Sequence, residues 1–190
     1  MSGTIELKTE RLCLRKHRFE DADVLFEMFG SDPQMFEYSG WNPYQTKEMA
    51  ADTIGSFIKS YEDPHFYGWG IELKGKLIGT IGAYDFDAEK SRIEVGVSIE
   101  RTSWGFGFAT EALTAVLRFL TEQESIKTVS AWCAADNIGS RRAMEKSGMH
   151  MIRSEAGTLK IGAQTYDKLF FEYKVAYLQK ERRYYDKRTV

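Results

Sequence analysis

The chain has 190 residues, of which 43% are hydrophobic and 28% charged, enough for one globular domain with a full core. Its 26 basic and 28 acidic residues leave a net charge of −2, so no general attraction to nucleic acid or to an anionic membrane is expected. Two cysteines far apart in the sequence form no disulfide framework, so we expect a reducing, cytoplasmic environment. The N-terminus lacks the apolar core of a signal peptide, and no run approaches the ~18 apolar residues of a membrane span.

The first part of the chain predicts a strand followed by two helices. Leucines alternate with other residues in the stretch 9–15, which is typical of a strand. Acidic residues at the start of the segment 19–30 suit the first turn of a helix, because the helix dipole favours negative charge there. Thr46 is a suitable N-cap for a second helix, which Asp63-Pro64 would end.

The middle of the chain predicts a hairpin, a central strand and a helix. The stretches 66–73 and 76–84 have the composition of strands, and Lys74-Gly75 between them is a two-residue hairpin signal. Apolar residues at every second position of 93–99 predict a half-buried strand. Apolar residues then recur at spacings of three and four from position 108 to 120, which predicts an amphipathic helix.

The last part predicts a smaller unit of the same sheet. Its elements are a strand at 128–133, a short helix at 140–146, and strands at 149–155 and 168–175. With the earlier elements this order predicts a mixed α/β sheet in a single domain. We place the domain at residues 1–176 and expect a charged C-terminal tail at 177–190, helical or frayed.

The turn between the central strand and the central helix carries two glycines. Gly105 and Gly107 have no side chain, so a ligand can approach the backbone there. The first N–H groups of the helix lack intrahelical partners, and the helix dipole favours an anion, which makes this turn a candidate phosphate site. It is not a dinucleotide fingerprint, because Thr110 stands where a third small residue is needed, and no G-K-[ST] follows.

Two motifs together resemble those of the GCN5-related N-acetyltransferases (GNAT). Trp104-x-x-Gly107-x-Ala109 is similar to the family's pyrophosphate loop, Q/R-x-x-G-x-G/A, with Trp at the first position, and W-G-x-G-F-A-T-E-A resembles the RimJ/RimL branch. Downstream, the segment 136–149 resembles N-x-x-S-x-x-x-x-x-K-x-G-F, with Met at the last position. The resemblance covers about residues 8–176 and implies a mixed, mostly antiparallel twisted sheet flanked by helices.

The resemblance implies that acetyl-coenzyme A (acetyl-CoA) is the acyl donor. Val97 and Ile99 would offer backbone hydrogen bonds to its pantetheine arm, between two diverging strands, and Asn137 would bond the arm from the other side. Asn137 has a second interpretation, as a turn or cap residue. The residues that would bind the pyrophosphate are Trp104, Gly105, Phe106, Gly107, Phe108, Ala109 and Thr110.

Two residues are candidates for the chemistry of acyl transfer. Ser140 matches a serine that RimL-like members place near the sulfur, although it is equally a candidate helix cap. A tyrosine that serves as acid in many members is replaced here by Met144, which cannot donate a proton. Glu94, on the central strand, is the candidate base, with a solvated or salt-bridged strand residue as the alternative. Glu111 lies one turn into the central helix. Its expected role there is not that of the base: its negative charge would interact with the helix dipole, or its side chain would tie the helix to a neighbouring segment.

The expected acceptor is a protein N-terminal α-amine, of the ribosomal-protein type. Alternatives are an enzyme acting on a small amine, polyamine or aminoglycoside, and a module that binds acyl-CoA without catalysis. A nucleotide-binding oxidoreductase is disfavoured by the antiparallel hairpin before the motif and by Thr110. The aromatic residues of 35–44 either line an acceptor pocket or belong to the core. The histidines have no ligand spacing, so we expect no metal. We expect no membrane or direct nucleic-acid partner, and the oligomeric state stays open, a homodimer included.

Overall fold

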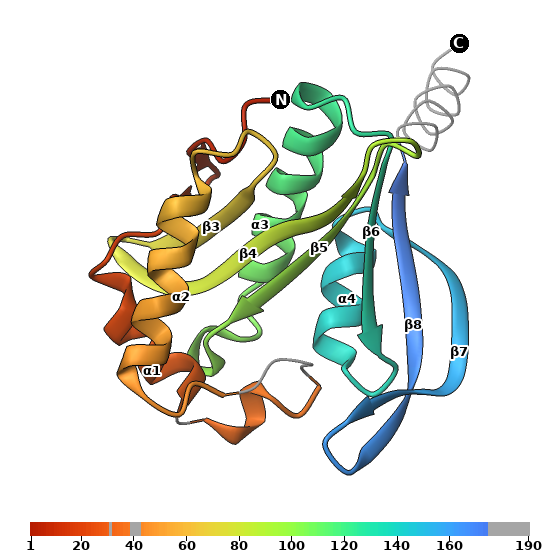
Figure 1. Ribbon diagram of the computed structural model, residues 1–190. Coiled ribbons are helices and arrows are strands. Elements are labelled where there is room, and N and C mark those ends of the chain that lie inside the picture. Colours follow the sequence, from red (N-terminus) through yellow and green to blue (C-terminus); the bar gives the residue numbers. More distant parts are fainter. Residues whose placement is uncertain (31, 39–42, 175–190) are drawn as a thin grey trace.

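A computed structural model describes residues 1–30, 32–38 and 43–174, and its framework is an eight-stranded sheet with the order β1-β2-β3-β4-β5-β6-β8-β7 (Figure 1). The strands are β1 (Leu7–Lys8), β2 (Leu12–Arg15), β3 (Tyr67–Leu73), β4 (Lys76–Asp87), β5 (Arg92–Ile99), β6 (Thr128–Ala134), β7 (His150–Ile161) and β8 (Gln164–Lys174). Neighbouring strands are antiparallel except β5 and β6, which are parallel. The mixed, mostly antiparallel sheet expected from the sequence is therefore confirmed.

Helices cover both faces of this sheet. They are α1 (Asp21–Gly30), α2 (Lys47–Ser60), α3 (Phe108–Arg118), which continues into a π-helical turn (Phe119–Gln123), and α4 (Ile138–Lys146), with 3₁₀ turns at Pro33–Met35 and Arg101–Ser103. In Figure 1, α1 and α2 lie in front of the sheet and α3 and α4 lie behind it. No helix among the described residues is long and apolar enough to cross a membrane.

The main core lies between the sheet and α3. The apolar stripe predicted for this helix is buried there, with Ala112, Leu113, Val116 and Leu117 each at most 1% exposed. They pack against Ile93 and Val95 of β5, the inward side of the predicted alternation. A smaller apolar cluster fastens α1 and α2 to the other face through residues such as Leu25 and Ile54. The central strand and helix thus bury their facing sides in one core, and the glycine turn lies between them in the chain.

Local signals in the sequence place several element boundaries correctly. The hydroxyl of Thr46 accepts a hydrogen bond from the Met49 N–H at 3.3 Å, so Thr46 is the N-cap of α2. Lys74 and Gly75 have φ of 50° and 83°, which is the left-handed pair that a two-residue hairpin requires. A Gly30 terminus for α1 also agrees with the prediction.

The final hairpin differs from the prediction. β7 and β8 extend to a tight turn, with Ile161 paired to Gln164, whereas the sequence predicted strands that end at 155 and begin again at 168. Most of β7 is exposed on both faces, so its side chains do not alternate in polarity, and a register shift at 155–159 interrupts the pattern further. A short β1 was also not expected. The predicted tail at 177–190 and the boundary at 176 lie outside the described residues.

Candidate active site

The strands β5 and β6 begin as a parallel pair and then separate. Their ladder covers Arg92–Glu94 and Thr128–Ser130, and beyond it the two strands diverge (Figure 1). The paired end is fastened by side chains: the Ser130 hydroxyl donates to the Ile93 carbonyl at 3.1 Å, and Arg92 reaches across to Glu172 on β8 at 3.0 Å. The facing edges of 95–99 and 131–134 carry backbone groups that no β5–β6 pair uses. This divergence is the one that the sequence resemblance implied for an extended pantetheine arm.

The glycine turn leads from the end of β5 into α3. Gly105 and Gly107 have φ of 83° and 82°, a left-handed conformation that side chains disfavour. Gly107 is the N-cap of α3, and no side chain caps this helix end. Trp104 and Phe106 are 48% and 63% exposed, so the turn faces solvent. The first N–H groups of α3 are therefore left to an external acceptor, which fits a phosphate.

The tryptophan that replaces Gln or Arg at the start of the motif has a structural role. Its indole Nε1 donates to the carbonyl oxygen of Ile99 at 2.6 Å. The turn is thereby fastened to the end of β5. The carbonyl of Ile99 is one of the backbone groups expected to hold the pantetheine arm, and this bond already engages it. Val97, the other residue expected to hold the arm, lies two residues earlier and is half-buried beside the core.

Arg11, which sequence reasoning missed, clamps the glycine turn from the other end of the chain. Its guanidinium donates to the Phe106 carbonyl at 3.0 Å, lies 4.5 Å from the centre of the Phe108 ring, and pairs with Glu111 at 2.6 Å. Burial opposes ionisation of Glu111, but hydrogen bonds from Thr9 and Arg11 outweigh it and lower its pKa. Glu111 thus ties α3 to the segment before β2, one of the two roles expected for it. No local signal in the sequence links positions one hundred residues apart.

The start of α4 resolves two interpretations of the second motif. The Asn137 side-chain oxygen accepts from the Ser140 N–H at 3.0 Å, so Asn137 is the N-cap of this helix. The capping role considered for Ser140 therefore belongs to Asn137, and Ser140 is a half-buried residue of the first turn. Met144 is 3% exposed and lies in the core. The position at which the family resemblance would place a tyrosine acid is therefore an apolar packing position in this chain.

Glu94 points to the face of the sheet opposite α3. It is half-buried, and its Oε1 accepts a hydrogen bond from the indole Nε1 of Trp132 on β6 at 2.8 Å. Tyr84 is its direct partner in the β4–β5 register. Burial, the charge of Glu94 and a hydrogen bond to it all raise the pKa of Tyr84. Both of these groups, the Trp132 indole and the Tyr84 hydroxyl, are neutral donors.

Aromatic residues of the α1–α2 connection divide between two environments. Tyr38 contacts Tyr166 of β8, with ring centroids 5.4 Å apart, beyond the end of β6. A hydrogen bond to Glu37, partial desolvation and nearby charges that include Asp136 raise the pKa of Tyr38. Tyr44 instead packs on Phe29 in the α1–α2 cluster. Trp41, another aromatic residue of the stretch 35–44, lies outside the described residues.

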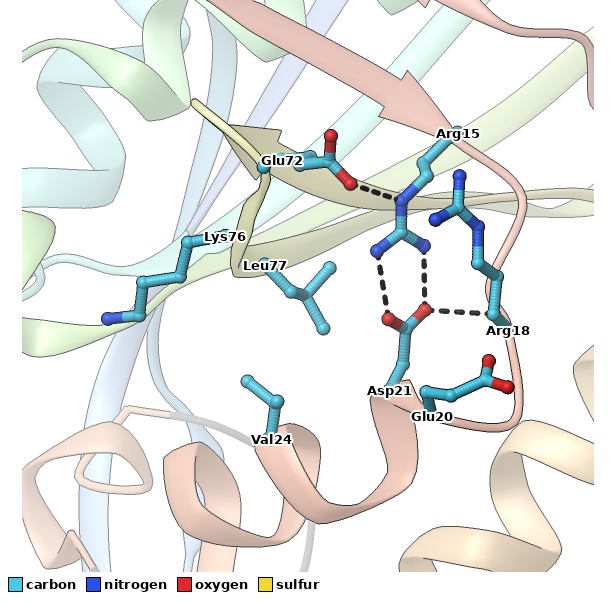
Figure 2. Close-up of a pocket in the computed structure, with 9 residues that line it drawn as sticks. Arg15, Arg18, Glu20, Asp21, Val24, Glu72, Lys76 and Leu77 are labelled. Carbon is cyan, nitrogen blue, oxygen red and sulfur yellow. Dashed lines mark hydrogen bonds and ion pairs between the residues drawn. The ribbon is translucent and has the colours of Figure 1, made fainter.

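A cavity of about 420 Å³ lies beside the β3–β4 turn, away from the β5–β6 divergence. Figure 2 shows the Arg15 guanidinium between Glu72 and Asp21, with bonds of 2.6 Å to Glu72 and 2.8–2.9 Å to Asp21. Asp21 also accepts from the Arg18 N–H at 2.9 Å. Burial opposes ionisation of Asp21, but these hydrogen bonds outweigh it and lower its pKa. The network holds the start of α1 on the sheet, which is a structural role.

No three His, Cys, Asp or Glu side chains gather as a metal site within the part of the chain that the structure describes. The predicted site residues lie on the elements that border the β5–β6 divergence. The glycine turn opens α3, Val97 lies on the part of β5 that does not pair with β6, Asn137 and Ser140 follow β6, and Glu94 ends the ladder.

Comparisons with known proteins show the family of this chain. The family model described as "Acetyltransferase (GNAT) domain" matches residues 11–150. The chain is 31% identical over 144 residues to the uncharacterized N-acetyltransferase YoaA of Bacillus subtilis (strain 168), covering 75% of this chain and 81% of that protein.

Two solved structures share the fold at low sequence identity. RimL, a ribosomal L7/L12 α-N-protein acetyltransferase in complex with coenzyme A, has a TM-score of 0.81 at 12% identity and covers 90% of this chain and 98% of its own. The ribosomal-protein-S5-alanine acetyltransferase of Vibrio fischeri has a TM-score of 0.80 at 14% identity, over 90% of this chain and 96% of its own. With the match of the family model and the relation to YoaA, the chain therefore belongs to the GNAT family and is an acetyl-CoA-dependent N-acetyltransferase.

Proposed function

We propose that this enzyme acetylates the α-amino group of a protein N-terminus, with Glu94 as the base. The observation that carries the proposal is the position of Glu94, at the end of the β5–β6 ladder and on the face opposite α3. Its hydrogen-bond donor Trp132 is neutral. An amine that approaches from the α1–α2 face would meet this carboxylate beside the diverging strands.

The donor would enter from the other face. Residues 104–110 would bind its pyrophosphate through the uncapped N–H groups of α3, and the arm would follow β5 past Ile99 and Val97. The Asn137 oxygen already accepts from Ser140, so its amide N–H₂ is the group that would meet the arm. Two features suit the donor to this position. The glycines of the turn have no side chain that would keep the pyrophosphate from the backbone, and β5 and β6 separate where the arm would lie.

The strength of the base favours an α-amine. An α-amine has a pKa of about 7.7–8.0, so roughly a third of such amines are neutral at pH 7.5, against about one lysine in a thousand. A side-chain carboxylate is a modest base. It suffices to accept, directly or through water, the proton of an α-amine that arrives charged, because the pKa of this amine lies close to neutral pH. Removing the proton of a lysine ammonium requires a stronger base, because the pKa of that ammonium is about 10.4.

Two further observations support the proposal, the first for an amine acceptor in general and the second for a protein. Glu37 and Asp136 place negative charge around the Tyr38–Tyr166 contact, which would attract a protonated amine before it loses its proton. RimL and the ribosomal-protein-S5-alanine acetyltransferase, both similar in fold, are named for acetylation of ribosomal proteins. Met144 is buried and has no proton to donate to the leaving sulfur. Ser140 would therefore donate the hydrogen bond to this sulfur.

The test is a pair of peptides with the same sequence, one with a free N-terminus and one with a blocked N-terminus, each containing an internal lysine. Thiol release from acetyl-CoA is followed, together with the mass and site of the product. We expect acetylation of the free peptide at its α-amine and little reaction of the blocked one. Equal rates on the two peptides, or faster turnover of a polyamine than of either, would contradict the proposed acceptor.

A further inference from the structure

Tyr84, Glu94 and Trp132 converge on one face of the sheet, where β5 and β6 begin to separate. Tyr84 is opposite Glu94 in the β4–β5 register. Glu94 is beside Ser130 in the β5–β6 register, and Trp132 follows Ser130 by two residues on β6. Residues two apart on a strand share a face, so all three side chains emerge on the side of α1 and α2. The 2.8 Å bond from Trp132 to Glu94 spans the start of the divergence.

The tyrosine hydroxyl lies over Gly96, two residues farther along β5. A Cβ atom built on Gly96 would be 3.0 Å from the Tyr84 hydroxyl oxygen and 3.5 Å from its ring. The ring thus occupies the space above a position without a side chain. The hydroxyl points from Glu94 toward the part of β5 that no longer pairs with β6, and Tyr84 is 43% exposed. An amine that reaches the diverging strands over Gly96 would meet this hydroxyl before it meets Glu94.

We propose that Tyr84 is a further catalytic residue, which passes the proton of the acceptor amine to Glu94. The amine nitrogen forms a bond to the acetyl carbonyl carbon, and the carbon–sulfur bond breaks with its electron pair on the departing thiolate. The proton lost by nitrogen moves to the Tyr84 oxygen while the hydroxyl proton of Tyr84 moves to the Glu94 carboxylate. Glu94 gains one proton, and Tyr84 is unchanged. This relay rests on the proposed role of Glu94 as base.

The surroundings of Tyr84 suit a relay rather than an independent base. Burial and the neighbouring Glu94 charge raise its pKa, so the hydroxyl stays protonated and able to donate. Trp132 is then a positioning residue, because its N–H fixes one carboxylate oxygen and with it the orientation of Glu94. Gly96 leaves room for this position of the tyrosine, because a Cβ there would press on the hydroxyl.

The test is a double-mutant cycle on the full chain with Tyr84→Phe, Glu94→Gln and the double variant. Acetylation of a peptide with a free N-terminus is measured under saturating acetyl-CoA. We expect Tyr84→Phe to lower kcat about 10- to 100-fold, at or below the lower end of general acid–base effects, with the KM for acetyl-CoA unchanged. The double variant should be no slower than Glu94→Gln alone, since both changes interrupt one proton path. Tyr44→Phe, in the α1–α2 cluster, is the matched control and should keep full activity.

Three outcomes would overturn the relay. They are losses that multiply in the double variant, a Tyr84→Phe effect confined to the KM values, and a Glu94→Gln variant with wild-type kcat. A thermal melt of each variant shows whether a loss reflects unfolding. If the wild type prefers another amine to the peptide, the proposed acceptor fails, and the same cycle on that amine still decides the relay.

Discussion

Replacing Gly107 by alanine separates backbone strain from ligand contact in the glycine turn. Gly107 has a φ of 82°, and a Cβ there would lie 3.6 Å from an Arg11 nitrogen, which is an ordinary contact. The protein alone therefore has space for the methyl group, and the cost is conformational, about 1–2 kcal/mol for a left-handed residue. For a chain of this size that corresponds to a fall in Tm of about 2–8 °C.

Gly75 provides a matched control. It has a φ of 83° in the β3–β4 turn, with nothing within 4 Å of a built Cβ. Gly75→Ala should therefore lower the Tm by a similar amount. It should leave acetyl-CoA affinity unchanged, because this turn is not part of the proposed site.

The affinity of the Gly107 variant should fall where that of the control does not. A methyl group at Gly107 keeps a phosphate from the N–H groups of the turn, and a hydrogen bond to a charged group contributes about 1.5–3 kcal/mol. We expect the Kd for acetyl-CoA to rise about 10- to 100-fold by calorimetry on folded protein. If Gly107→Ala and Gly75→Ala bind acetyl-CoA equally well, the turn is not the phosphate site.

Three other substitutions test separate parts of the structure. Asp21→Asn should cost about 1.5–3 kcal/mol in urea unfolding, because the buried Arg15 then keeps only Glu72 as a charged partner. The pKa of Asp21 is lowered by folding, so its contribution is full above about pH 4 and is lost as pH falls below that value; the variant should show a flatter acid dependence. Arg11→Ala should weaken acetyl-CoA binding about 5- to 10-fold in the same calorimetric assay, because the turn loses its clamp and must be ordered on binding. Ser140→Ala should lower kcat about tenfold with little change in the KM for acetyl-CoA, because a bond to sulfur strengthens as charge develops, and steady-state kinetics distinguish this from a loss of binding.

Sequence periodicity was sufficient for the centre of the fold. The alternation in 93–99 and the helical spacing from 108 correspond to β5 and α3, because both elements bury one face against the same core. The Thr46 cap and the Lys74-Gly75 turn were predictable for a different reason, since each is a local preference of the residues concerned. The length of β7 and β8 was not predictable, because their outer half is exposed and has no apolar face.

The candidate site was only partly readable in the sequence. The glycine turn has a local signature, and so does the Asn137 cap of α4. Arg11, Tyr84 and Trp132 have none, because each reaches the site through strand pairing or through contacts between distant segments. A lone tyrosine or tryptophan in a strand is most simply a packing residue, and only the register shows which charge it faces.

The most direct test of the central claim is the pH–rate profile of Glu94→Gln beside the wild type, on the peptide with a free N-terminus. If Glu94 removes the proton of an α-amine, the variant should be about 10²-fold slower near pH 7. The loss should shrink as pH rises past about 8, where most α-amines are already neutral. A loss that is the same at every pH would contradict the account and make Glu94 a structural residue.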